Sequence, residues 1–110
     1  MNLSGVPPRQ KRLRLVSPKL RASAKGQPCT LRLPCCNHDQ DTTVLAHLRF
    51  FGWAGVAEKP DDYLGVFACS ACHDAIDGRG RNLWEFEDLL RALGETLRAH
   101  FLAGRLVEGK

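Results

Sequence analysis

The sequence lacks any run of about 18 consecutive apolar residues among its 110 residues, and this excludes a membrane-spanning helix. It also lacks the apolar stretch of a secretory signal peptide, because Pro7, Pro8 and further basic residues occupy that place. We therefore expect a cytoplasmic protein with no membrane association. In that compartment, and at an odd count, the five cysteines are better explained as metal ligands than as disulfide partners.

Acidic residues are absent from residues 1–28, where much of the positive charge is concentrated. The segment holds seven basic residues: Arg9, Lys11, Arg12, Arg14, Lys19, Arg21 and Lys25. The other 82 residues keep nine of the sixteen Lys and Arg, against all twelve Asp and Glu. Because four prolines disfavour a long helix or strand here, we predict a flexible basic arm that binds DNA. A solubilising terminus is the alternative.

Residues 29–110 are predicted to form one small domain of about 80 residues, a size at which a hydrophobic core alone is marginal. Domains this small commonly need a disulfide or a structural metal ion in addition to the hydrophobic core. A structural zinc ion can contribute about 10 kcal/mol or more of apparent binding free energy, which is also folding free energy. The cysteines are the candidate ligands.

Hydropathy patterns within this domain predict a small α+β fold. Strands are expected at 29–34, 42–51 and 63–68, followed by a helical segment at about 71–77 that Gly78 and Gly80 close. A long C-terminal helix can be capped by Asn82. Its apolar stripe is predicted to cover the core, and consists of Leu83, Phe86, Leu90, Leu93, Leu97 and Phe101.

The strongest local motif is Cys69-Ser70-Ala71-Cys72-His73, in which two thiols can bind one metal ion from a tight turn that opens a helix. Haem attachment is disfavoured because no export signal is visible and Met1 is the only methionine. A thioredoxin-like pair would need a βαβ unit. A zinc ion needs two more ligands, which Cys29 and Cys36, or less favourably Cys35, can supply.

Two histidines outside this thiol set suggest chemistry. His47 lies near the end of a predicted strand, and His73 lies in the first turn of the helix behind Cys72. One histidine from a strand and one from a helix is the arrangement of a ββα-metal active site. There one imidazole activates water and the other holds a divalent cation against the scissile phosphate.

These motifs resemble the prophage YbcO-like nuclease family, which is of HNH type and akin to phage recombination-enhancement nucleases. The resemblance covers about residues 19–80 and is carried by residues 44–49, by Lys59-Pro60 and Asp62, and by residues 68–77. It implies a zinc-stapled ββα-metal endonuclease that acts on DNA in phage recombination or repair, and it makes a recombinase a possible partner.

The resemblance also implies roles for individual residues. His47 would be the general base, His73 a ligand of a catalytic Mg²⁺ or Mn²⁺ ion, and the structural zinc would be bound by Cys29, Cys36, Cys69 and Cys72. The central Asn of the HNH motif is missing, and Asp62 or its neighbour Asp61 occupies the corresponding region. Ala46 stands where many HNH sites carry a further metal ligand.

Several charged residues near the second histidine complete the candidate site. Asp77 lies four positions after His73 and shares its helix face, so it could be a metal ligand or support one. Arg79 and Arg81 follow in a glycine-rich turn and could contact phosphates.

The rival hypothesis is a zinc-containing DNA-binding or recruitment module without catalysis. The sequence leaves the oligomeric state open.

Overall fold

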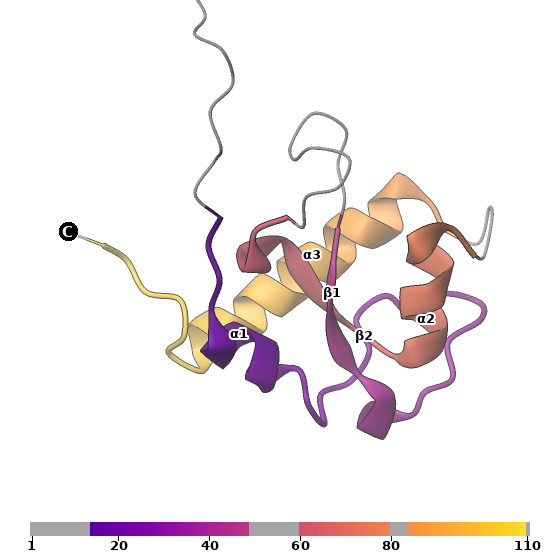
Figure 1. The fold of residues 1–110 in the computed structure, drawn as a ribbon, viewed down its shortest axis with the longest axis horizontal. Coiled ribbons are helices and arrows are strands. Elements are labelled where there is room, and N and C mark those ends of the chain that lie inside the picture. Colours follow the sequence, from indigo (N-terminus) through magenta and orange to yellow (C-terminus); the bar gives the residue numbers. More distant parts are fainter. Residues whose placement is uncertain (1–13, 49–59, 80–83, 110) are drawn as a thin grey trace, which may run out of the picture.

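The computed structural model describes residues 14–48, 60–79 and 84–109. At its centre, strands β1 (Val44–His47) and β2 (Gly65–Ala68) form an antiparallel hairpin. Helix α3 (Phe86–Leu102) passes behind this hairpin, while α1 (Pro18–Ser23) and α2 (Ser70–Asp74) lie on either side of it (Figure 1). The described part of the chain is therefore a small α+β domain, as the sequence predicts.

The register of the hairpin places His47 opposite Gly65 and Leu45 opposite Phe67. These strands confirm the centres of the two predicted at 42–51 and 63–68. Gly65 is required sterically, because a Cβ atom there would collide with the side chain of Leu45. All four residues of β2 are buried, which explains why its sequence is continuously apolar and does not alternate.

The predicted strand at 29–34 is absent, and this expectation was wrong. Arg32 has a φ angle of 47°, in the left-handed region, so the chain bends there and does not continue as a strand. The alternation in the sequence nevertheless reports burial correctly, since Leu31 and Leu33 both belong to the core. The backbone N–H of Thr30 donates to the carbonyl of Phe67 at 2.7 Å and ties this segment to β2.

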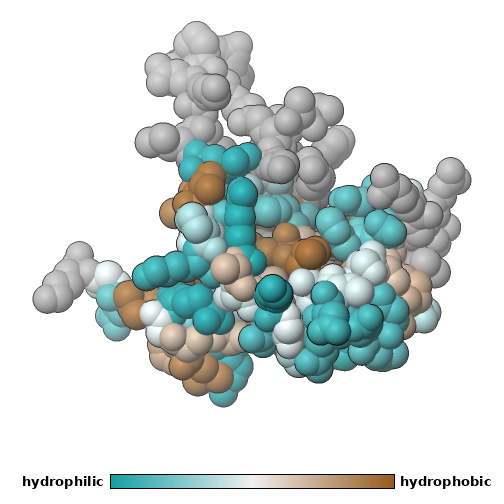
Figure 2. Space-filling model, turned by 60° about the horizontal axis from the view of Figure 1, so that its bottom comes forward, coloured by the Kyte–Doolittle hydropathy of each residue, from teal (hydrophilic) through white to brown (hydrophobic). Residues whose placement is uncertain are grey.

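Residues 14–28, which lie within the predicted flexible arm, have a defined structure that includes α1. Ser17 caps this helix by accepting a hydrogen bond from the Leu20 N–H, and Pro18 occupies its first turn, where proline is tolerated. The segment differs from the expectation because two buried carboxylates, described below, bind its backbone. The face at the bottom of Figure 1, which Figure 2 brings forward, is mostly hydrophilic, with separate hydrophobic patches.

The helical segment predicted at about 71–77 is confirmed. Helix α2 is capped by Cys69, whose sulfur accepts from the Cys72 N–H, and a wider helical turn continues it over Ala75–Arg79. Gly78 lies in this turn with a φ angle of 94°, which glycine adopts without strain. The turn thus ends the helix at the predicted glycine, whereas Gly80 lies outside the described residues.

Helix α3 is present, but its predicted cap was wrong, and its predicted core stripe was right only in part, since Leu93 packs against the core. It begins at Phe86 behind a capping box formed by Glu85 and Asp88, and not behind Asn82. Three residues of the predicted core stripe are largely exposed: Phe86 at 66%, Leu90 at 68% and Phe101 at 62%. Leu83 lies outside the described residues. The face that packs inward carries Leu89, Ala92, Thr96 and His100.

Hydrogen bonding explains this rotation of α3. The hydroxyl of Thr96 accepts from the backbone N–H of Phe67 at 3.1 Å and lies 3.4 Å from the hydroxyl of Thr30. Because an unpaired buried N–H is costly, Thr96 is held against β2, and the side of α3 that carries Thr96 therefore faces the core. His100 packs edge-on against the Phe67 ring, with ring centroids 5.5 Å apart. Burial and nearby Arg105 lower the pKa of His100.

Candidate active site and metal centre

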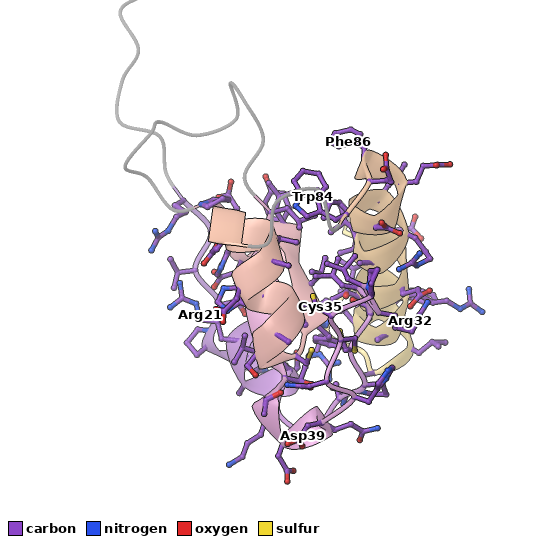
Figure 3. All side chains as sticks on the ribbon, turned by 90° about the vertical axis from the view of Figure 1, so that its right-hand side faces the viewer. Arg21, Arg32, Cys35, Asp39, Trp84 and Phe86 are labelled. Atoms are coloured by element: carbon purple, nitrogen blue, oxygen red, sulfur yellow. The ribbon has the colours of Figure 1, made fainter. Side chains whose placement is uncertain are left out.

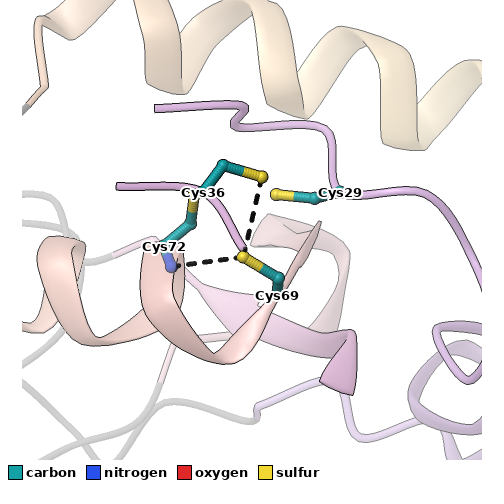
Figure 4. Close-up of side chains that lie close together, drawn as sticks. All are labelled: Cys29, Cys36, Cys69 and Cys72. Atoms are coloured by element: carbon teal, nitrogen blue, oxygen red, sulfur yellow. Dashed lines mark hydrogen bonds between the residues drawn. The ribbon is translucent and has the colours of Figure 1, made fainter. Parts of the chain in front are cut away.

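Four cysteines meet beside the hairpin, from parts of the chain far apart in sequence. The sulfurs of Cys29, Cys36, Cys69 and Cys72 all lie within 4.8 Å of one another (Figure 4). Tetrahedral zinc with bonds of about 2.3 Å would place its sulfurs about 3.8 Å apart, which is the distance between the sulfurs of Cys36 and Cys69, 3.8 Å. The cluster is therefore consistent with a structural zinc.

Cys35 lies outside this cluster. Its thiol donates to the carbonyl of Ala71 at 3.7 Å, and the side chain packs against the core as a small apolar residue would. The local cause is a turn after Leu33, whose carbonyl accepts from the Cys36 N–H at 2.8 Å and so directs Cys36 toward the other thiols. The choice between the two adjacent cysteines is thus decided by the fold in favour of Cys36.

The thiols have unequal acidities in this cluster. Burial would raise the pKa of Cys69, but hydrogen bonds to its sulfur from the Cys72 and Asn37 backbone outweigh burial and lower it to about 7. Burial raises the pKa of Cys72 and Cys36, and the neighbouring thiols raise both further. Four clustered thiolates therefore repel one another unless a cation lies between them, and Zn²⁺ supplies that charge.

His47 is paired with Asp62 at the end of the hairpin. Its Nε2 lies 2.8 Å from Oδ1 of Asp62, whose side chain is fully buried, while the imidazole is 17% exposed. The other oxygen of Asp62 accepts from the Ser17 N–H at 2.6 Å and from Nε of Arg21 at 2.9 Å. Asp62 thus fixes His47 and also docks α1.

Asp62 is held in its ionised form. Burial opposes ionisation, but the hydrogen bonds from Arg21, from the Ser17 N–H and from His47 outweigh it and hold the pKa of this carboxyl below its ordinary value. The adjacent Asp61 does a different job, since its Oδ1 accepts from the Leu15 N–H at 2.6 Å. Of the two carboxylates, the one in contact with His47 is Asp62.

The second histidine faces the same pocket as the first. The pocket has a volume of about 770 Å³, and its lining includes His47, His73, Asp77, Arg21 and Lys25. His73 comes from α2 and lies outside the four-cysteine cluster. Its Nε2 is 3.5 Å from Oδ2 of Asp77, one helical turn away. Both side chains are partly exposed, so the pair is open to solvent and to a ligand.

The predicted DNA-contacting residues are mostly beyond what the structure describes. Arg9, Lys11, Arg12 and Arg81 lie outside the described residues, as does the side chain of Arg79, while Arg14 is exposed. Arg21, which Figure 3 labels on α1, and Lys25 were expected only as basic residues of the arm, but both line the pocket. The Ser17-Pro18 pair is a helix-start signal and could have indicated that this segment folds.

No helix within 14–48, 60–79 or 84–109 combines the length and apolarity needed to cross a membrane.

Comparison with known proteins agrees with the resemblance seen in the sequence. The chain is 49% identical over 61 residues to "Putative nuclease YbcO" of Escherichia coli (strain K12), and equally to "Putative nuclease ybcO" of Enterobacteria phage 82. Each match covers 54% of this chain and 64% of the relative's length, so the chain spans less than two thirds of these curated proteins.

A solved structure has the same fold. It is described as "Structure of a putative bacteriophage protein from Escherichia coli str. K-12 substr. MG1655" and has a TM-score of 0.61 and 32% sequence identity. The similarity covers 78% of this chain and 100% of that chain. The family model described as "Putative nuclease YbcO" matches residues 18–103. This chain therefore belongs to the YbcO family of nucleases, which has members in phage and prophage genomes.

Proposed function

We propose that this protein is a metal-dependent endonuclease that hydrolyses phosphodiester bonds of DNA. The observation that carries the proposal is the pocket shared by His47 and His73, with the buried Asp62 behind the first imidazole and Asp77 beside the second. A proton acceptor and a pair of metal-binding groups in one solvent-open pocket are the requirements of the HNH mechanism. Family membership supports the same reaction class.

His47 is the general base in this proposal. Because Asp62 is ionised, it accepts a hydrogen bond from the Nε2–H of His47, and this fixes the tautomer in which Nδ1 carries the free lone pair. Nδ1 takes a proton from water while the water oxygen attacks phosphorus and the bond to the 3′ oxygen breaks. The products then carry 5′-phosphate and 3′-hydroxyl ends, as in HNH enzymes.

His73 and Asp77 are the proposed ligands of a catalytic Mg²⁺ or Mn²⁺ ion. The imidazole nitrogen and carboxylate oxygen are 3.5 Å apart, and the carboxylate oxygen is a ligand that suits either ion. When bound, the ion supplies charge stabilisation for the phosphate and the departing oxygen. Ala46, which precedes His47, is buried and offers no ligand atom. With few protein ligands, we expect weak affinity and a need for millimolar concentrations of ion.

The positive charge around the pocket is suited to a phosphate backbone. Arg21 and Lys25 line the pocket, and Nε of Arg21 donates to Asp62. Together with the proposed arm residues Arg9, Lys11, Arg12 and Arg14 and with Arg79 and Arg81, they would give affinity that falls with salt and is independent of sequence. We place the activity in phage recombination or repair, where a recombinase could recruit the protein.

The test is nicking of supercoiled plasmid by the full chain with Mg²⁺ or Mn²⁺. His47→Ala should abolish nicking, and Asp77→Asn should raise the metal concentration needed for half-maximal activity. Asp41→Asn, at an exposed carboxylate in the turn before β1, is the matched control and should behave as wild type. Zinc content and thermal unfolding of each variant show whether the fold is retained.

A non-catalytic DNA-binding module is the second candidate, and the absence of a ligand atom at Ala46 favours it. It predicts salt-sensitive DNA binding by wild type and His47→Ala alike, with no nicking by either at any metal concentration.

A further inference from the structure

Helix α3 carries an apolar face that points away from the core of the described domain. We call it the outer stripe, and it consists of Phe86, Leu90, Leu97 and Phe101, with Leu93 at its inner edge, where that side chain packs against the core. Phe86, Leu90 and Phe101 are between 62% and 68% exposed. Figure 3 shows Phe86 at the periphery of the molecule, at the start of α3. A stripe of this kind on a small domain marks an interaction surface.

A glycine in the middle of the outer stripe supports this conclusion. Gly94 lies inside α3, where glycine costs about 1 kcal/mol relative to alanine. A Cβ atom at this position would meet nothing within 4 Å, so no packing within the described part of the chain requires glycine there. A glycine there would let a second helix cross at Gly94 with a close approach of the two backbones.

The order of residues along the outer stripe reads the same in both directions. Phe86 and Phe101 are at its ends, Leu90 and Leu97 lie inside them, and Leu93 and Gly94 share its centre. If a second copy of α3 runs antiparallel with its two-fold axis between Leu93 and Gly94, each Phe meets the other Phe and each Leu the other Leu. We propose that the outer stripe is the interface of an antiparallel, two-fold symmetric dimer of this chain.

Charge beside the stripe favours the antiparallel direction. Glu87 and Arg98 are both exposed and project from the same side of α3, one near each end. In the antiparallel pair, Glu87 approaches Arg98 of the partner subunit, and the symmetry makes this contact twice. A parallel pair would instead place equal charges next to each other, which is unfavourable.

The size of the outer stripe fits a weak, reversible dimer. A fully exposed Phe side chain offers roughly 200 Å², so the two Phe side chains and Leu90 together expose on the order of 400 Å² per copy. The total is then about 800 Å² for the pair, below the roughly 1,200 Å² at which stable specific interfaces begin and in the range of weak, transient encounters. We therefore expect a transient dimer that forms only at high protein concentration.

The test is sedimentation equilibrium of the full chain over a wide range of concentrations. Wild type should fit a monomer–dimer equilibrium, and Leu90→Lys should weaken association by more than about tenfold. The matched control is Leu102→Lys, which changes an equally exposed leucine of the same helix that lies outside the stripe. The control should leave the equilibrium unchanged.

Charge exchange tests the direction of pairing independently. Glu87→Arg and Arg98→Glu should each weaken the dimer roughly three- to tenfold, and the double exchange should restore it. Because all these positions are exposed, the variants should unfold at nearly the wild-type temperature. A wild type that stays monomeric into the hundreds of micromolar, equal effects of Leu90→Lys and Leu102→Lys, or no recovery in the double exchange would each overturn the proposal.

Discussion

Replacing Asp62 with asparagine should separate the two jobs of this carboxylate. The asparagine side chain would have one acceptor oxygen where Asp62 has two. Its amide NH₂ group would replace the second oxygen and would face groups that now donate hydrogen bonds to Asp62. If the oxygen stays with the Ser17 N–H and Arg21, the amide donates to Nε2 of His47. His47 must then carry its proton on Nδ1, which is the wrong tautomer for a base.

The expected magnitudes follow from these contacts. Loss of the correct tautomer should reduce the rate of DNA cleavage by about 10²- to 10⁴-fold, the range that general acid–base catalysis contributes. Loss of the buried negative charge weakens the hydrogen bonds from the Ser17 N–H and Arg21, which should lower the free energy of unfolding by roughly 1–3 kcal/mol. The larger effect is therefore on chemistry and not on folding.

The assay is single-turnover nicking of plasmid by Asp62→Asn and wild type, at a temperature where both are folded. Asp61→Asn is an informative comparison, because Asp61 binds the Leu15 backbone and not His47. It should lose stability while keeping most of its activity. If Asp62→Asn cleaves within a few-fold of wild type, the proposed role of the carboxylate in orienting His47 is refuted.

Three further outcomes follow from the geometry. Cys36→Ser should lose its zinc and unfold on mild heating, whereas Cys35→Ser should retain one zinc per chain, as measured by elemental analysis; equal loss in both would contradict the four-cysteine assignment. Thr96→Val should cost about 1–3 kcal/mol in denaturant unfolding, because the buried Phe67 N–H loses its acceptor, while Thr96→Ser should cost much less. The pKa of Asp62 is lowered in the folded protein, so the ionised carboxylate stabilises the fold fully above its unfolded pKa of about 3.9, and this stabilisation is lost as pH falls through the folded value. The difference in free energy of unfolding between wild type and Asp62→Asn should therefore shrink below about pH 4. A difference that stays constant with pH would count against an ionised carboxylate.

The parts of the fold that the sequence predicts are those governed by local patterns. The strands at Val44–His47 and Gly65–Ala68 follow from runs of β-branched and apolar residues, and the turn that ends α2 follows from Gly78. The two Cys69 and Cys72 ligands follow from their spacing. Each of these features depends on residues within a few positions of one another, so one window of sequence contains the information.

The features that the sequence does not predict depend on contacts between distant residues. The inward face of α3 is chosen by the hydrogen bond from Phe67 to Thr96, and apolar periodicity alone favoured the neighbouring face with Leu90 and Phe101. The ordering of residues 14–28 likewise depends on buried Asp62, more than 40 positions away, which binds the Ser17 backbone. Composition and proline content cannot reveal such a partner.

The most direct test of the account is chemical rescue of His47→Ala. The imidazole of His47, hydrogen-bonded to Asp62, is the proposed proton acceptor for the attacking water. Single-turnover cleavage by His47→Ala should be undetectable with Mg²⁺ or Mn²⁺ alone and should return in part when free imidazole is added, in proportion to its unprotonated fraction. Wild-type rates in His47→Ala without imidazole would contradict the account.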